Sequence, residues 1–354
     1  MPSLFDPITV GDLVLPNRVF MSPLTRCRAG DDFVPSDLMV EYYGQRAGAG
    51  LIITEGTPVS PQGVGYFRTG GIWNKAHVAG WKRVTERVHA RGGRIFMQIW
   101  HVGRVSDPVF HDGALPVAPS ASAPAGHVSL LRPQRPYVVP RALTTAEVRD
   151  VVEQFRRGAQ LAQEAGFDGV EMHGANGYLL DQFLQDSTNH REDEYGGSVE
   201  NRARLMLDAT DAAISVWGAG RVGMHLAPRA DGHTMGDSDL PGTFGYVADQ
   251  LRQRGIAFIC ARERAGSDAL GPMLKQRFGG VYVVNEGYTK AAAQAALDAG
   301  VADAVAFGKL FIANPDLVQR LRADAPLNPP DTNTFYGGGA EGYVDYPTLS
   351  QLTA

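Results

Sequence analysis

The 354-residue sequence has only two cysteines, Cys27 and Cys260. Two thiols cannot form a disulfide framework, a four-thiolate zinc site or a cysteine-ligated iron–sulfur cluster. No run of apolar residues approaches the roughly 18 that a membrane span needs. The first residues carry Asp6 and Asp12 and lack the basic and apolar regions of a signal peptide. We therefore expect a cytoplasmic protein without a metal centre.

Basic clusters are lacking as well. The chain has 33 Lys and Arg against 38 Asp and Glu, a formal charge of −5. A mildly acidic chain without a basic run is not expected to bind nucleic acid or an anionic membrane surface. With 44% hydrophobic and 20% charged residues the composition is that of a packed globular protein and excludes disorder. The expected partner is a small-molecule substrate, and the expected assembly is a monomer or a homodimer.

Short apolar runs recur along the chain, and most lack strict alternation, which is typical of strands buried on both faces. These runs are Val19–Leu24, Leu51–Gly56, Arg94–His101, Gly169–Gly174, Val222–Pro228, Ile256–Arg262, Val281–Gly287 and Asp303–Gly308. Eight such repeats predict an α/β protein with a single (β/α)8 TIM barrel; an open doubly wound sheet is the second possibility. We expect one domain over residues 1–354, with a loop insertion at about 102–141 and an irregular C-terminal segment at about 326–354.

Segments with apolar residues at helical spacing follow the strands. They are Asp37–Ala49, His77–Ala90, Thr145–Ala165, Val199–Val216, Phe244–Arg254, Ala269–Phe278, Thr289–Ala299 and Asn314–Arg322. Ser198 and Thr289 stand where N-caps are expected, and Gly255 and Gly279 where left-handed C-caps are expected.

One stretch formally matches a dinucleotide-binding fingerprint, Gly218-Ala-Gly220-Arg-Val-Gly223. That motif works only after a strand and at the start of a helix, where the helix N-terminus meets a pyrophosphate. These glycines precede a predicted strand, so we interpret them as a helix-to-strand turn.

Glycine loops close the last two predicted strands. Asn285-Glu286-Gly287 follows the seventh strand and Gly308-Lys309 follows the eighth. In a (β/α)8 barrel a phosphate often binds after strands seven and eight, on backbone N–H groups. The two loops together predict a phosphate site, with simple turn glycines as the alternative.

Polar side chains gather after the fourth predicted strand, at His173, Asn176 and Tyr178. His173 and Asn176 can both donate hydrogen bonds, which suits an oxygen that gains negative charge during a reaction. Tyr178 can act as a proton donor. A structural role for the histidine is the alternative, but the C-terminal end of a barrel strand is where catalytic groups lie.

With these residues the chain resembles the Old Yellow Enzyme family of FMN-dependent ene-reductases. The resemblance is carried by the motifs Met21-Ser-Pro-Leu-Thr-Arg26, His173-Gly-Ala-Asn-Gly-Tyr178, Phe183-Leu-Gln-Asp-Ser-Thr-Asn-His-Arg191, Tyr195-Gly-Gly-Ser-Val-Glu-Asn-Arg202 and Gly342-Tyr-Val-Asp-Tyr-Pro347. Pro-Leu-Thr, where a second subgroup carries Met-Cys, is similar to the subgroup with the yeast and enterobacterial enzymes.

The resemblance implies a role for each matching position. FMN would contact Pro23, Leu24, Thr25, Gly56, Gln98, His225, Glu286, Gly287, Gly308 and Lys309, and Tyr66, Trp100 and Tyr343 would shape the substrate cavity. NADPH or NADH would supply a hydride to the flavin, which passes it to the β carbon of an activated alkene. His173 and Asn176 would hold the substrate oxygen, and Tyr178 would protonate the α carbon. The implied substrates are α,β-unsaturated carbonyls, nitroalkenes and nitrate esters.

Two positions depart from the family pattern. His225 stands on the fifth strand where the family usually has arginine beneath the flavin pyrimidine, and Lys309 stands where arginine usually follows glycine. Lysine keeps the charge but loses the two-pronged guanidinium fork. We expect both changes to affect the affinity or the potential of the flavin, not the site for the substrate oxygen; Arg26 or Arg262 could supply the missing cation.

Other functions stay open. A glycoside hydrolase would need two carboxylates flanking one bond, for which Glu171 and Glu286 are the candidates. A non-catalytic flavin-binding protein is the second alternative. A dihydroorotate-type flavin barrel is less well supported, since its lysine and serine or cysteine motifs have no counterpart, and the cysteine count excludes iron–sulfur dienoyl reductases.

Overall fold

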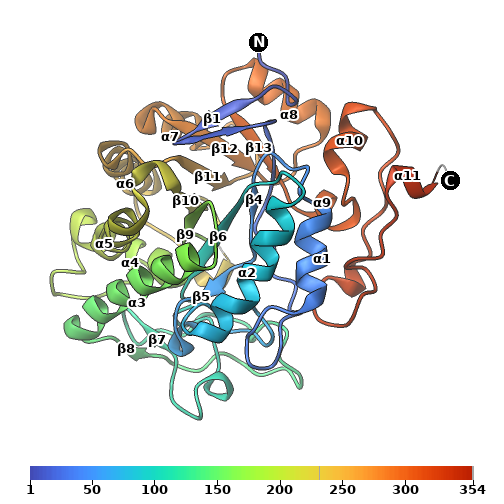
Figure 1. The fold of residues 1–354 in the computed structure, drawn as a ribbon. Coiled ribbons are helices and arrows are strands. Elements are labelled where there is room, and N and C mark those ends of the chain that lie inside the picture. The colour runs from blue at the N-terminus through green and yellow to red at the C-terminus, as the bar shows by residue number, and fades with distance from the viewer. Residues whose placement is uncertain (231, 353–354) are drawn as a thin grey trace.

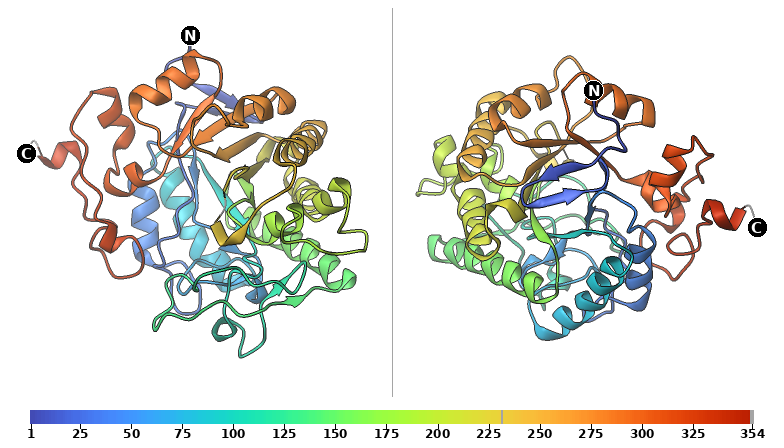
Figure 2. Two further views of the ribbon diagram at one scale, coloured as in Figure 1. Left: turned by 180° about the vertical axis from the view of Figure 1, so that it is seen from behind. Right: turned by 45° about the horizontal axis from the view of Figure 1, so that its top comes forward.

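Eight parallel strands close into a barrel in the computed structural model, which describes residues 1–230 and 232–352 (Figures 1 and 2). In chain order they are β3 (Val19–Met21), β4 (Ile52–Ile53), β6 (Ile95–Trp100), β9 (Gly169–Gly174), β10 (Val222–Leu226), β11 (Phe258–Arg262), β12 (Val281–Asn285) and β13 (Ala304–Phe307). The ring closes because Ile52 pairs with Met21 of β3 and with Ile95 of β6. The predicted (β/α)8 barrel is confirmed, and the open sheet is wrong.

The barrel interior is filled by side chains from alternate strand positions, among them Phe20, Phe96 and Phe258. A short antiparallel hairpin, β1 (Ile8–Val10) and β2 (Leu13–Leu15), packs its apolar face on this interior cluster. Its turn meets the chain just before β10, where Asp12 N donates to Gly220 O. The hairpin therefore closes the N-terminal end of the barrel, and Figure 1 shows it at the top.

Helices surround the strands and bury their apolar stripes against them (Figure 2). They are α1 (Asp37–Gln45), α2 (Lys75–His89), α3 (Thr145–Glu164), α4 (Leu179–Leu184), α5 (Val199–Trp217), α6 (Leu240–Arg254), α7 (Gly271–Phe278), α8 (Lys290–Asp298), α9 (Lys309–Ala313), α10 (Leu317–Arg322) and α11 (Leu349–Leu352). The predicted caps are confirmed: the Ser198 and Thr289 side chains accept from the backbone of Asn201 and Ala292. No helix within the described residues is long and apolar enough to cross a membrane.

Several boundaries differ from the prediction because polar caps, which the apolar pattern does not show, set the helix ends. Helix α2 begins before His77, where Asn74 accepts from the backbone N–H of His77. Helix α6 begins four residues before Phe244 because Asp239 caps it. The glycines of the formal dinucleotide motif form a helix-to-strand turn, as expected: Gly218 ends α5 and a 3₁₀ turn, η3 (Ala219–Arg221), leads into β10.

The long connection between β6 and α3 gathers at the end of the barrel opposite the hairpin (Figure 1). It carries a 3₁₀ turn, η2 (Pro108–Phe110), and two short paired strands, β7 (Val117–Ala118) and β8 (Arg141–Ala142). Nearby, β5 (Thr57–Pro58) follows β4, pairs with β6 and is followed by a 3₁₀ turn, η1 (Pro61–Gly63). At this end the strands terminate and the site is built.

The C-terminal segment runs down one side of the barrel beside α1 and α10, through η5 (Thr332–Thr334) to α11 (Figure 1). Two buried arginines hold it. Arg26 donates to the carbonyls of Phe335 (2.8 Å) and Gly342 (2.9 Å), and Arg28 to that of Thr334 (2.8 Å). The last two residues of the predicted segment, Thr353 and Ala354, lie outside the described residues.

Candidate active site

A cavity of about 1050 Å³ opens where the barrel strands end. Fourteen of the sixteen predicted site residues line it: Pro23, Leu24, Thr25, Gly56, Gln98, Trp100, His173, Asn176, Tyr178, His225, Glu286, Gly287, Gly308 and Lys309. They come from all around the ring, so the barrel brings together groups that lie almost 300 positions apart. A space of this size lies at the upper end for ligand sites and can take a large cofactor together with a small substrate.

The turn after β9 is held from below. Asn176 has φ +60° and Gly177 φ +77°, both in the left-handed region. The backbone N–H of Gly177 donates to Asp181 Oδ2 at 2.9 Å, and Gln185 donates to the other carboxylate oxygen at 2.7 Å. Asp181 is fully buried, and this burial raises its pKa to about 7. The turn that carries Asn176 and Tyr178 is therefore fixed by a side chain that does not reach the cavity.

His173 presents a defined face to the cavity. The indole of Trp100 stacks on it with ring centroids 5.5 Å apart. The backbone N–H of Ala175 donates to Nδ1 at 3.4 Å, so Nδ1 is the acceptor and Nε2 carries the proton. Burial first, and the neighbouring His225 second, lower the pKa of His173 well below its ordinary value. His173 is thus a neutral hydrogen-bond donor through Nε2.

Tyr178 and Tyr66 form a buried pair whose hydroxyl oxygens are 2.8 Å apart. Burial raises the pKa of both phenols, so both stay protonated near neutral pH. Trp100 packs against both rings, with centroids at 4.6 Å from Tyr178 and 5.7 Å from Tyr66. Tyr66 is not among the residues that line the cavity; it lies behind Tyr178 and orients the hydroxyl.

Gln98 and His225 form the polar floor of the cavity, and Glu171 lies behind them. Gln98 Nε2 donates to Glu171 Oε2 at 2.7 Å, and His225 Nδ1 lies 3.5 Å from the same oxygen. Cys260 lies beside them: one potential metal-ligand atom from each of Glu171, His225 and Cys260 lies within 4.8 Å of the other two. Among the described residues, Glu171 Oε1 and His225 Nδ1 have no hydrogen-bond partner. Sequence spacing could not predict this cluster, because its members come from three neighbouring strands.

The loops after β12 and β13 are open and glycine-rich. Glu286 and Gly287 have successive positive φ angles of 91° and 79°. Lys309, at the start of α9, lines the cavity and forms no ion pair within residues 1–230 and 232–352. Backbone N–H groups beside an unpaired cation suit an anion. The carboxylate of Glu286 does not serve such a site, because it pairs with Arg262 and Arg264.

The structure places Tyr343 away from the cavity and gives Gly56 a packing role. Tyr343, expected at the substrate cavity, lies elsewhere: it is fully buried, stacks on Tyr42 with centroids 4.1 Å apart and lies under the Arg28 guanidinium. Tyr336, from the same segment, lines the cavity instead. Gly56 is required by a protein neighbour, since a Cβ there would lie 2.6 Å from the Trp100 indole.

Arg262 also lines the cavity, and the sequence marked it only as a possible cation. It is the last residue of β11, and the C-terminal ends of barrel strands carry function. This position at a strand end was the feature of the sequence that could have identified Arg262 as a site residue. Arg26, the other candidate cation, is committed to the C-terminal segment and is fully buried.

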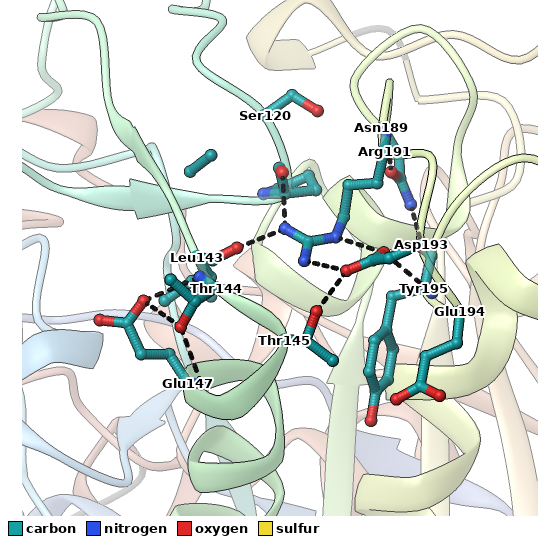
Figure 3. Close-up of polar contacts among 12 residues, drawn as sticks. Ser120, Leu143, Thr144, Thr145, Glu147, Asn189, Arg191, Asp193, Glu194 and Tyr195 are labelled. Atoms are coloured by element: carbon teal, nitrogen blue, oxygen red, sulfur yellow. Dashed lines mark hydrogen bonds and ion pairs between the residues drawn. The ribbon is translucent and has the colours of Figure 1, made fainter.

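Arg191, from the Phe183–Arg191 motif, lies in a polar network outside the cavity lining (Figure 3). Arg191 donates to the carbonyls of Pro119 (3.1 Å) and Leu143 (2.5 Å) and pairs with Asp193, which accepts from Thr145 Oγ1 at 2.6 Å. Asn189 donates to the carbonyls on either side of the loop. This network ties the loop after α4 to the start of α3 and to the β6–α3 connection.

Comparisons with known proteins agree with this geometry. The profile of the NADH:flavin oxidoreductase / NADH oxidase family matches residues 3–328. A probable flavin mononucleotide-dependent alkene reductase of Leishmania infantum is 44% identical, over 98% of this chain and 97% of the relative. 12-Oxophytodienoate reductase 1 of Oryza sativa subsp. japonica is 41% identical, over 99% and 94%.

Solved structures are equally similar. The Old Yellow Enzyme homologue from Zymomonas mobilis is 45% identical, covers 98% of this chain and all of its own, and superposes with a TM-score of 0.96. Morphinone reductase in complex with tetrahydroNAD is 48% identical over 99% of this chain and 98% of its own, with a TM-score of 0.95.

Proposed function

The chain belongs to the NADH:flavin oxidoreductase / NADH oxidase family as an Old Yellow Enzyme homologue, and we propose that its cavity acts through His173, Asn176 and Tyr178. Its activity is FMN-dependent reduction of activated carbon–carbon double bonds with NADH or NADPH as the hydride donor. The observation that carries the proposal is the convergence of two hydrogen-bond donors and one buried, protonated phenol on one wall of the cavity.

The residues of the cavity fit FMN. Gln98 Nε2 donates to Glu171, so Gln98 Oε1 remains as an acceptor for an N–H of the flavin pyrimidine. His225 Nδ1 is buried and lacks a partner among the described residues. The backbone at Gly287 and Gly308 and the side chain of Lys309 would hold the phosphate. Pro23, Leu24 and Thr25 would line the ring system.

When bound, FMN supplies the redox chemistry by carrying a hydride from NADH or NADPH to the β carbon of the alkene. The neutral His173 donates through Nε2 and Asn176 through Nδ2 to the carbonyl or nitro oxygen of the substrate. These bonds strengthen as that oxygen gains negative charge. Tyr178 gives its proton to the α carbon, and the hydrogen bond from Tyr66 stabilises the phenolate that remains.

The proposed substrates are α,β-unsaturated carbonyls, nitroalkenes and nitrate esters. Two of the relatives take their names from 12-oxophytodienoate and morphinone, which are ketones, and this supports the carbonyl class. The glycoside hydrolase alternative loses its basis, because Glu171 is fully buried outside the cavity lining and Glu286 is held by two arginines.

We also propose one FMN-binding domain over residues 1–354, a cytoplasmic location and a monomer or homodimer. The free, buried thiols of Cys27 and Cys260 support a reducing compartment. Light scattering of the purified protein measures the assembly.

The experiment is anaerobic titration of the FMN-loaded protein. NADH and NADPH, tested in parallel, are each expected to bleach the flavin absorbance, and a cyclic enone is expected to restore it, whereas the saturated ketone does not. A protein that takes up no FMN contradicts the proposal. A yellow protein that neither nicotinamide bleaches is a flavin-binding protein without this activity.

A further inference from the structure

Arg262 connects two parts of the site that the sequence treats separately. Its Nη1 donates to Asn176 Oδ1 at 3.0 Å, and its Nε donates to Glu286 Oε2 at 2.5 Å. Asn176 follows β9 and Glu286 follows β12, so the guanidinium of β11 bridges loops from two other strands. Arg262 therefore connects the carboxylate of Glu286 with the amide of Asn176.

The contact fixes which way the amide of Asn176 faces. An asparagine amide can turn over and exchange its oxygen with its nitrogen, but a guanidinium has only donors and can be met only by the oxygen. With Oδ1 engaged by Arg262, the N–H₂ group faces the other way. Asn176 lines the cavity, and its Nδ2 makes no hydrogen bond to the described residues, so this N–H₂ group is available to a ligand.

The positive charge of Arg262 also interacts with His173 and Tyr178. Together with burial, the larger cause, it lowers the pKa of His173, and it opposes the rise in the pKa of Tyr178 that burial produces. The charge therefore stands close to the place where the substrate oxygen becomes negative, while Glu286 keeps the guanidinium at the wall.

We propose that Arg262 is a positioning residue for ene-reduction: it holds the amide of Asn176 with its N–H₂ toward the substrate oxygen, and Glu286 holds Arg262. The proposal rests on the proposed role of Asn176. It moves the carboxylate of Glu286 from the cofactor site to the oxygen site, while the backbone at Glu286 and Gly287 stays with the phosphate.

The chain offers a matched control. Arg264 also lines the cavity and pairs with Glu286, at 3.5 Å, but its side chain is 84% exposed and makes no hydrogen bond to Asn176 within the described residues. Half-exposed ion pairs contribute little to stability, about 0–1 kcal/mol, so neither Arg262→Met nor Arg264→Met is expected to unfold the protein.

The test is titration of the FMN-loaded protein with a simple phenol, followed through the long-wavelength charge-transfer band. Arg262→Met is expected to weaken phenol binding roughly three- to tenfold, less than the loss of Asn176 itself, because the amide stays in place but is no longer held in one orientation. Arg264→Met is expected to leave it unchanged, and Arg262→Lys to restore part of it. The affinity for FMN is expected to stay the same in all three variants.

Coupling to Asn176 decides between an indirect and a direct role. In an Asn176→Ala background, Arg262→Met is expected to have no further effect on phenol binding. Additive losses would show that Arg262 contacts the ligand itself and would overturn the proposal, as would a loss of FMN affinity in Arg262→Met. Unchanged phenol binding in Arg262→Met, beside a loss in Asn176→Ala, overturns this inference alone. A wild-type protein that gives no phenol band overturns the proposed function instead.

Discussion

The end of β9 and the loops after β12 and β13 face the same cavity but are built in opposite ways. At β9 the side chains are buried and held: His173 by Trp100 and the Ala175 N–H, and Tyr178 by Tyr66. At β12 and β13 the backbone is open, with positive φ at Gly287 and an unpaired Lys309 within the described residues. The first region offers fixed side-chain donors, and the second offers backbone N–H groups and the exposed cation of Lys309.

The difference follows from what each region has to recognise. A substrate oxygen that becomes charged only during the reaction needs donors already in place, because reorganising them would add to the barrier. A phosphate is charged throughout, so backbone N–H groups and a flexible lysine suffice. Substitutions on the β9 side should therefore affect substrate steps, and those on the other side should affect retention of the cofactor.

The largest effect is expected from removing the proton donor. Tyr178→Phe should slow reoxidation of the flavin by an enone roughly 10²–10⁴-fold, the usual contribution of a general acid. Reduction by NADH or NADPH should change little. Stopped-flow absorbance measures both half-reactions, and Tyr66→Phe, which removes only the supporting hydroxyl, should have a smaller effect. Equal losses in the two half-reactions would make Tyr178 a binding residue.

The oxygen site comes next. His173→Ala or Asn176→Ala should each weaken the binding of a simple phenol by roughly ten- to a hundredfold, because a hydrogen bond to a charged oxygen is worth about 1.5–3 kcal/mol. The charge-transfer band should weaken with it. A full band at unchanged affinity in both variants would place the substrate elsewhere in the cavity.

Lys309→Met probes the opposite region. We expect roughly tenfold weaker FMN binding, because one charge-assisted contact is lost while the backbone N–H groups remain. Quenching of flavin fluorescence measures the affinity. Lys275→Met, which removes a lysine paired with Asp303 outside the cavity lining, is the control. Equal affinity in both variants would remove Lys309 from the phosphate site.

The smallest effect is expected at the floor of the cavity. His225→Arg places a permanently charged guanidinium at the floor of the cavity, where the chain has an imidazole, and a positive charge there favours the reduced flavin. The flavin midpoint potential at pH 8 should rise by roughly 30 mV, which is about 1.4 kcal/mol for two electrons. Potentiometry of the wild type and His225→Arg between pH 6 and 8.5 measures the midpoint potentials. Equal potentials in the two proteins would show that residue 225 does not influence the potential of the flavin.

Most of the barrel could be predicted because strands buried on both faces leave an unbroken apolar signal, as in Ile95–Trp100. The β1–β2 hairpin could not, since each strand has three residues and alternates buried with exposed positions over a very short span. Helix α4 was hidden for a different reason: all six of its residues are buried, so it shows no amphipathic pattern.

The site could be predicted wherever a residue directly follows a strand, as His173 and Gly308 do. The prediction failed where the position of a side chain depends on contacts with distant segments of the chain. Tyr343 and Tyr336 lie in one irregular stretch, and only the bonds from Arg26 and Arg28 to its carbonyls decide which ring faces the cavity. The contact of Arg262 with Asn176 joins β11 to β9 across β10, which no sequence spacing shows.

The most direct test of the two-region account is to measure two affinities, for FMN and for a phenol, in Asn176→Ala and in Lys309→Met. The account predicts a crossed result: Asn176→Ala loses phenol affinity and keeps FMN, and Lys309→Met loses FMN affinity but binds phenol normally once it is loaded. If either substitution weakens both affinities to a similar extent, the two regions do not act separately and the account is wrong.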